Sequence, residues 1–167
     1  MSGLDAPSEW VKRWAPLVAG GTVLDLACGA GRHAKLFLAR KLEVVAVDRE
    51  AREIPGARFI RTDLEDGSLW PLPGEQFEGI VVTNYLHRPL FPRILESLKP
   101  GGVLIYETFM LGNERFGKPS NPAFLLRPGE LLEAFKGLVV QGHEEGEVKG
   151  PKPAMIQRLC AVMPGWR

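Results

Sequence analysis

The chain has 167 residues, of which 45% are hydrophobic and 25% are charged, and its formal net charge is +1. This length fits one domain with a substantial core, so we expect a single domain over residues 1–167. The net charge supplies no overall field to attract nucleic acid or an anionic membrane. No apolar run has the roughly 20 residues of a spanning helix, and no basic segment precedes a hydrophobic one at the N-terminus, so a cytoplasmic protein is expected.

The two cysteines, Cys28 and Cys160, lie in apolar runs and have no CxxC spacing. Such a pair indicates neither a disulfide framework nor a zinc site. We therefore expect two reduced, structural thiols and no metal.

Short β-type runs alternate with helical patterns along the chain. In chain order we expect helix 8–18 with Ser8 as N-cap, strand 22–27, helix 31–41, strands 43–48, 58–63 and 77–84, helix 90–100 closed by Pro100 and Gly101, strand 101–109, loop 110–127, helix 128–137, and strands 138–148 and 154–163. This order predicts an α/β, Rossmann-like, doubly wound and mostly parallel sheet of about seven strands with helices on both faces. The last two strands predict an antiparallel C-terminal hairpin at the sheet edge.

A glycine-containing turn, VLDLACGAGRHA over residues 23–34, follows the first expected strand. Gly29, Gly31 and Ala34 fit the pattern G-x-G-x-x-A, which lets the backbone approach a ligand and offers helix N–H groups to it. A dinucleotide and S-adenosylmethionine both suit such a loop. Asp25 favours S-adenosylmethionine, because a carboxylate repels pyrophosphate and attracts an ammonium and a sulfonium. The alternative for Asp25 is a carboxylate that only holds its own loop together through backbone N–H groups.

Four segments together resemble the class I S-adenosylmethionine-dependent methyltransferases: DLACGAG (25–31), VVAVD (44–48), RTDLED (61–66) and LKPGGVLIYE (98–107). The resemblance runs from about Thr22 to residue 109, and Ala27 stands where many members have the first of three glycines. NYLHRPLF (84–91) and the compact size are more loosely similar to the small-molecule methyltransferases of the tellurite-resistance and thiopurine type. The resemblance implies an enzyme that transfers a methyl group from S-adenosylmethionine to a small-molecule acceptor and releases S-adenosylhomocysteine.

The resemblance also implies a set of cofactor-binding residues. Asp48 would accept both ribose hydroxyls, although it could instead cap the next turn. Asp63 would accept from the adenine amine and the Leu64 N–H would meet a ring nitrogen, with Glu65 and Asp66 as substitutes for Asp63. The full expected set is Asp25, Ala27, Gly29, Gly31, Asp48, Asp63, Leu64 and Asn84.

Asn84, Tyr85 and His87 follow strand 77–84, from which this fold presents side chains to the methyl group, and we expect them to be the catalytic residues. Asn84 would contact the donor or the acceptor. His87 is the candidate base, because an imidazole titrates near neutral pH. The alternative is a loop histidine that hydrogen-bonds to backbone.

The acceptor-binding residues are expected at strand 101–109 and in loop 110–127. Tyr106 and Glu107 point in opposite directions, and Glu107 is the expected polar contact. Loop 110–127 would act as a lid in which Arg115 and Lys118, joined by Arg88, favour an anionic or electron-rich acceptor. The alternative is a solvated loop whose charges serve solubility.

Other functions stay open at this point. RNA or protein as the acceptor is disfavoured because the basic residues are scattered and no aromatic stacking platform is present. A nicotinamide-dependent oxidoreductase is disfavoured by Asp25 and by the closing hairpin, and a non-catalytic cofactor-binding protein is the remaining alternative. The acceptor atom (O, N, S or a metalloid) and the oligomeric state are left open.

Overall fold

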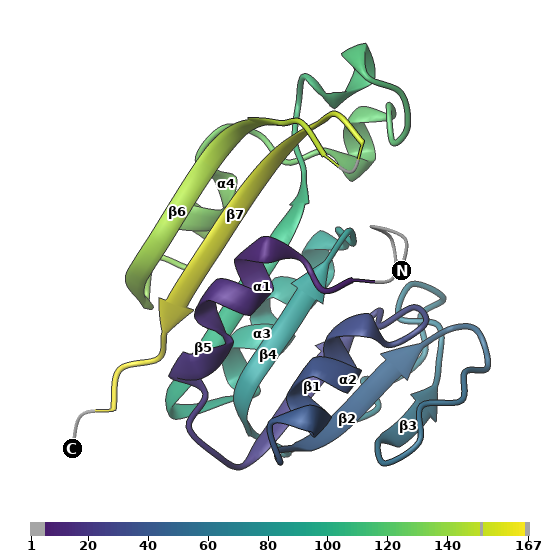
Figure 1. Cartoon of the computed structure of the whole chain (residues 1–167), viewed down its shortest axis with the longest axis vertical. Helices are drawn as coiled ribbons and strands as arrows, with labels where there is room; N and C mark the ends of the chain where they lie inside the picture. The colour runs from purple at the N-terminus through teal and green to yellow at the C-terminus, as the bar shows by residue number, and fades with distance from the viewer. Residues whose placement is uncertain (1–5, 151, 166–167) are drawn as a thin grey trace.

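A computed structural model describes residues 6–150 and 152–165, which form one seven-stranded sheet (Figure 1). Its strand order is β3-β2-β1-β4-β5-β7-β6. The strands are β1 (Thr22–Leu26), β2 (Glu43–Asp48), β3 (Arg58–Arg61), β4 (Phe77–Thr83), β5 (Leu98–Phe109), β6 (Val139–Val148) and β7 (Ala154–Val162). Strands β1 to β5 are parallel, and β7 is antiparallel to both β5 and β6.

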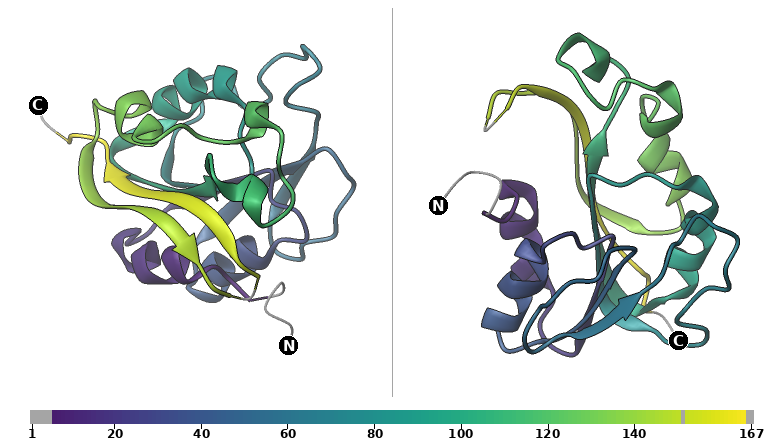
Figure 2. Two further views of the ribbon diagram at one scale, coloured as in Figure 1. Left: turned by 90° about the horizontal axis from the view of Figure 1, so that it is seen from above. Right: turned by 90° about the vertical axis from the view of Figure 1, so that its right-hand side faces the viewer.

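Helices cover both faces of the sheet, as the two further views show (Figure 2). The helices α1 (Glu9–Trp14) and α2 (Arg32–Ala39) cover one face, and α3 (Phe91–Glu96) and α4 (Glu130–Ala134) cover the other. The described residues also form short 3-10 helices, η1 (Ala15–Leu17), η2 (Arg88–Leu90), η3 (Asn113–Arg115) and η4 (Pro122–Phe124). The expected N-cap at Ser8 is confirmed, since its hydroxyl accepts the Val11 N–H at 3.1 Å.

Burial of both faces explains the composition of the central strands. Parallel strands covered on both sides are rich in apolar residues, and β1, β2 and β4 each contain three Val, Leu or Ile residues. One core cluster includes Leu24, Ile80 and Phe135 with α3 and α4, and the other includes Trp10 and Phe37 with α1 and α2. Asp25 is the carboxylate within this buried part of β1.

The predicted fold class and the C-terminal hairpin are confirmed. The order β5-β7-β6 shows that β7 pairs with the parallel part of the sheet and leaves β6 as the outer edge. Both cysteines are free and buried, and burial raises the pKa of each thiol to about 12, so both stay protonated. No helix within the described ranges is long and apolar enough to cross a membrane.

The prediction of a helix over residues 90–100 is wrong at its C-terminal end. Helix α3 ends at Glu96 with Ser97 as C-cap, and Leu98 already pairs with Phe77 of β4. Burial of Leu98 in the core therefore overrides the helical spacing that continues through the sequence. The loop 110–127 contains η3, η4 and a bridge between Met110 and Leu126, so it is more regular than its composition predicts.

Candidate functional site

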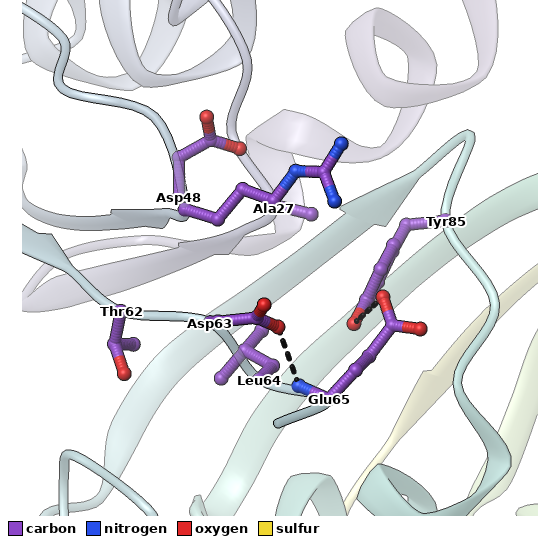
Figure 3. Close-up of a pocket in the computed structure, with 8 residues that line it drawn as sticks. Ala27, Asp48, Thr62, Asp63, Leu64, Glu65 and Tyr85 are labelled. Carbon is purple, nitrogen blue, oxygen red and sulfur yellow. Dashed lines mark hydrogen bonds between the residues drawn. The ribbon is translucent and has the colours of Figure 1, made fainter. Parts of the chain in front are cut away.

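The carboxyl ends of β1, β2 and β3 surround a first cavity of about 280 Å³. In Figure 3, Ala27 and Asp48 lie on one side of it, Asp63 and Leu64 on the opposite side, and Tyr85 beside them. Its lining residues are Ala27, Asp48, Arg49, Thr62, Asp63, Leu64, Glu65 and Tyr85. Four of these belong to the expected cofactor set: Ala27, Asp48, Asp63 and Leu64. The ends of β1, β2 and β3 therefore bring these four together, as the sequence predicts.

The glycine turn is shaped by three left-handed residues, Ala27 (φ 52°), Gly29 (φ 57°) and Gly31 (φ 87°). A Cβ at Gly31 would lie 2.8 Å from Ile54 Cδ1, so glycine here allows the positive φ and the close approach of the Ile54 side chain. A Cβ at Gly29 would meet nothing within 4 Å, so this position is open to a ligand. Ala27 is strained in this conformation, because an L side chain in the left-handed region costs about 1 kcal/mol.

Asp25 lies under this turn with 1% of its surface exposed. Burial raises the pKa of its carboxyl to about 7, against the opposing effects of a hydrogen bond from the Ala34 backbone and the charge of Arg32. Its Oδ2 is buried and has no hydrogen-bond partner within residues 6–150 and 152–165. Asp25 therefore holds the start of α2 and also keeps one acceptor atom unused.

The other two acids of the expected set each use one oxygen within the protein. Asp48 Oδ2 accepts from the Glu50 N–H at 3.2 Å and from Arg52 Nε at 3.1 Å. Asp63 Oδ1 accepts from the Glu65 N–H at 2.9 Å (Figure 3). Both are turn caps, and the described part of the chain gives the second oxygen of neither a hydrogen bond, so capping does not use up either carboxylate.

Two further cavities continue the first one. A bridging cavity, also about 280 Å³, shares Glu65 and Tyr85 with the first and is completed by Asn84, Leu86, Thr108, Phe109, Pro119 and Phe124. A large cleft of about 690 Å³ shares Asn84 and Phe109 with the bridging cavity. The three cavities thus form a continuous row along the carboxyl ends of the parallel strands.

The residues expected to be catalytic lie at different places along this row. Asn84 has a left-handed backbone (φ 53°), its N–H donates to the Glu107 carbonyl at 2.9 Å, and it lies where the bridging cavity meets the large cleft. Tyr85 lines the first two cavities, and its hydroxyl donates to Glu65 Oε2 at 3.1 Å. His87 lines none of the three, and its Nδ1 is 3.8 Å from Glu65 Oε1.

Tyr106 and Glu107 point to opposite faces, as predicted. Tyr106 packs edge to face on Phe91 in the core, with its hydroxyl donating to the Tyr85 carbonyl at 3.0 Å. Glu107 lines the large cleft and is paired with Arg158, which stands directly opposite it on β7.

The cations of the loop have separate roles. Lys118 lines the large cleft, whereas Arg115 does not: it donates to the Gly112 carbonyl at 3.1 Å and lies over the Phe116 ring. The expectation that Arg88 faces an acceptor is wrong. Its guanidinium is bound by Glu130 and by the backbone carbonyls of residues 123 and 125, so it fastens the end of the loop to α4.

Sequence reasoning missed the N-terminal wall of the large cleft, residues 6–9. Arg32 donates to the Ala6 carbonyl at 3.0 Å, and the Ser8 N–H donates to His33 Nε2, also at 3.0 Å. Since Nε2 accepts, His33 carries its proton on Nδ1, 3.3 Å from Thr83 Oγ1. Burial lowers the pKa of His33 to about 3 and keeps it neutral. The sequence did not indicate this role of His33, because Ser8 and Thr83 lie 25 and 50 residues away from it along the chain.

The large cleft also contains Lys152 and Arg158, which were not predicted. Lys152 comes from the turn before β7, and Arg158 comes from β7 itself. The antiparallel register of β7 with β5 places Arg158 opposite Glu107, which also lines the cleft. Within the described residues no group of three or more His, Cys, Asp or Glu side chains gathers as a metal site would.

Residues 5–134 match the family described as methyltransferase domain. The chain belongs to this family. Among the curated relatives of this methyltransferase domain, trans-aconitate 2-methyltransferase of Paracidovorax citrulli is 35% identical over 113 residues, 59% of this chain and 42% of the relative. Ribosomal protein L11 methyltransferase of Shewanella piezotolerans is 38% identical over 92 residues, 49% of this chain and 31% of the relative. The chain spans less than half the length of these two relatives.

Two solved structures show the same fold. TehB from Haemophilus influenzae has a TM-score of 0.72 at 17% identity and covers 92% of this chain and 61% of its own. An S-adenosylmethionine-dependent methyltransferase from Mesorhizobium loti has a TM-score of 0.72 at 19% identity and covers 96% of this chain and 100% of its own. At 17% and 19% identity these two comparisons show a shared fold only.

Proposed function

We propose that this methyltransferase domain binds S-adenosylmethionine and methylates a small carboxylic acid. The observation that carries the proposal is the continuous row of cavities, with carboxylates at the first cavity and most of the cations at the large cleft. S-adenosylmethionine, when bound, supplies an electrophilic methyl group on a sulfonium. The residues of the row then have to hold the donor, place the acceptor and exclude water.

The first cavity suits this donor better than a dinucleotide. Three acids line it, Asp48, Asp63 and Glu65, and the single cation is Arg49, which is near Glu50. Hydroxyl and amine groups of an adenosine donate to carboxylates, whereas pyrophosphate is repelled by them. Asp25 lies beneath the turn and lines none of the three cavities, and its carboxylate charge would favour a donor ammonium bound above the turn.

The large cleft suits an anionic acceptor. The cations that line it, Arg32, Lys118, Lys152 and Arg158, outnumber the acids, Glu9 and Glu107. The relatives named trans-aconitate 2-methyltransferase act, by their name, on a tricarboxylic acid. Asn84 lies at the entrance to the bridging cavity, where its amide can orient the acceptor toward the donor.

A direct test of the donor is calorimetry with S-adenosylmethionine and, separately, with NAD⁺, followed by S-adenosylhomocysteine release in the presence of small acids. The proposal expects heat of binding only with the first ligand and turnover with acids. Binding of NAD⁺ alone would exclude the proposal.

Gly29→Ala should separate ligand binding from folding. The free protein has room for the Cβ, so the backbone strain lowers the free energy of unfolding by only about 1 kcal/mol. A bound donor lies against this turn, so its dissociation constant should rise at least about tenfold. Calorimetry and urea denaturation measure the two effects, and Gly67→Ala, also at positive φ with open space, is the matched control. Equal loss of binding in both variants would refute the assignment of Gly29.

His87→Gln should leave turnover within about threefold of the wild type, because a carboxylate acceptor has no proton to be removed at neutral pH. The position of His87 outside the three cavities supports this expectation. The measurement is kcat with a carboxylic acid between pH 6 and pH 8. A large loss of kcat would restore the base role and point to a protonated acceptor.

Protein methylation is a second candidate, favoured by the relative named ribosomal protein L11 methyltransferase. Incubation with that ribosomal protein and methyl-labelled donor distinguishes the two. Label on the protein, with no turnover of acids, would favour this candidate.

A further inference from the structure

Two lysines from separate segments line the large cleft. Lys118 belongs to loop 110–127, and Lys152 belongs to the turn between β6 and β7; both line the cleft. Lys152 Nζ lies 4.0 Å from the place that a Cβ on Gly117 would occupy, so it reaches the residue next to Lys118. Figure 1 shows the two segments together at one end of the molecule.

Neither lysine has a carboxylate to neutralise it within residues 6–150 and 152–165. Other lysines of the chain do: Lys12 pairs with Glu9, Lys99 with Glu78 and Lys136 with Glu133. The nearby Glu114 instead accepts the Gly112 N–H with its Oε1, at 3.2 Å. An anion that binds between two unneutralised cations of one cleft is attracted by both charges.

The acids of the cleft are already paired. Glu107 binds Arg158, which also binds Glu144, and Glu144 in turn binds Arg13. This chain of two acids and two cations is neutral as a whole. Since the remaining acid, Glu9, pairs with Lys12, the net charge of the cleft comes from the two lysines and from Arg32, whose guanidinium donates to the Ala6 carbonyl.

Asn113 fixes the segments that carry the two lysines. It is 1% exposed, its Nδ2 donates to the Pro119 carbonyl at 2.9 Å, and its Oδ1 accepts the Met155 N–H at 3.0 Å. One buried amide therefore ties the residue after Lys118 to the start of β7, close to Lys152. The segments are held in place before any ligand arrives, which lowers the entropy lost on binding.

We propose that Lys118 and Lys152 are specificity-determining residues that bind the carboxylates of the acceptor that do not receive the methyl group. The acceptor class is then a di- or tricarboxylic acid, since one carboxylate must reach the bridging cavity while another lies between the lysines. This inference rests on the proposed function.

The test compares acids of increasing charge, crotonate, fumarate and trans-aconitate, by S-adenosylhomocysteine release in the wild type, Lys118→Gln, Lys152→Gln and the double variant. The double variant should raise KM for trans-aconitate about tenfold with kcat little changed, and should hardly affect crotonate. Lys99→Gln with Lys136→Gln removes the same net charge at lysines that, like their partners Glu78 and Glu133, lie outside the row of cavities, and is the matched control. Lys118→Arg with Lys152→Arg should keep most of the affinity.

The outcomes separate the inference from the proposed function. Turnover of the acids with an unchanged KM in the double variant would overturn the lysine assignment and leave the function standing. An equal rise of KM for crotonate and trans-aconitate, or in the control pair, would also overturn it. No turnover of any acid by a protein that binds S-adenosylhomocysteine would reject the acceptor class, and the inference with it.

Discussion

Asp48→Ala should raise the dissociation constant for S-adenosylmethionine about 100-fold or more and leave the fold intact. The carboxylate lines the first cavity with one oxygen unused, and two hydrogen bonds from ribose hydroxyls to a charged group account for a loss of this size. Within the protein the change removes only a surface pair with Arg52 and a turn cap, which together contribute about 1 kcal/mol.

Calorimetry measures the affinity, and circular dichroism checks the fold. Asp66→Ala is the matched control, because Asp66 also caps a turn through its own Oδ1 but does not line the cavity. Unchanged affinity in Asp48→Ala would remove the ribose role and leave Asp48 as a turn cap only.

Asp25→Asn should stabilise the free protein at pH 8 and weaken donor binding. Burial raises the pKa of Asp25 to about 7, so between about pH 4 and pH 7 the folded protein holds a proton that the unfolded chain has already lost. At pH 8 the folded protein has lost it as well and carries a buried charge. The stability associated with this proton is present below the unfolded pKa of 3.8 and is lost as pH rises to about 7. The difference is on the order of 4 kcal/mol at pH 8, and asparagine removes it. A donor ammonium favours the ionised form, so wild-type affinity should increase as pH rises through 7.

His33 makes the free energy of unfolding rise with pH, whereas Asp25 makes it fall with pH. Its pKa is lowered to about 3, so its contribution is lost as pH falls below 6.5, where the unfolded chain takes up a proton. In the wild type the two effects oppose each other between about pH 4 and pH 6.5. Urea denaturation of the ligand-free Asp25→Asn variant should therefore show stability that rises with pH, and His33→Gln should show stability that falls. Parallel profiles for the two variants would contradict the assignment of both groups.

The central sheet and the first cavity were predictable because local patterns determine them. The apolar runs of β1, β2 and β4 are long enough to be recognised, and a residue that ends a parallel strand lies at the ligand-binding edge. Asp48, Asp63 and Ala27 of the glycine turn therefore lie around one cavity, whereas Gly29 and Gly31 line none of the three cavities. The pKa of Asp25 was not predictable, since it depends on complete burial beneath the turn.

The large cleft was only partly predictable. Lys118 was identified from the composition of its loop, but the same reasoning selected Arg88 and Arg115, which fasten the loop to itself and to α4. Lys152 and Arg158 depend on the register of β7 against β5, which no local pattern in the sequence specifies. Charges in loops have no period, so only their partners in space separate binding groups from structural ones.

Transfer of a labelled methyl group from S-adenosylmethionine to trans-aconitate by the purified chain tests the proposed reaction itself. We expect equal amounts of S-adenosylhomocysteine and a labelled monomethyl ester that base hydrolyses back to the acid. Donor binding without any labelled product from carboxylic acids would contradict it.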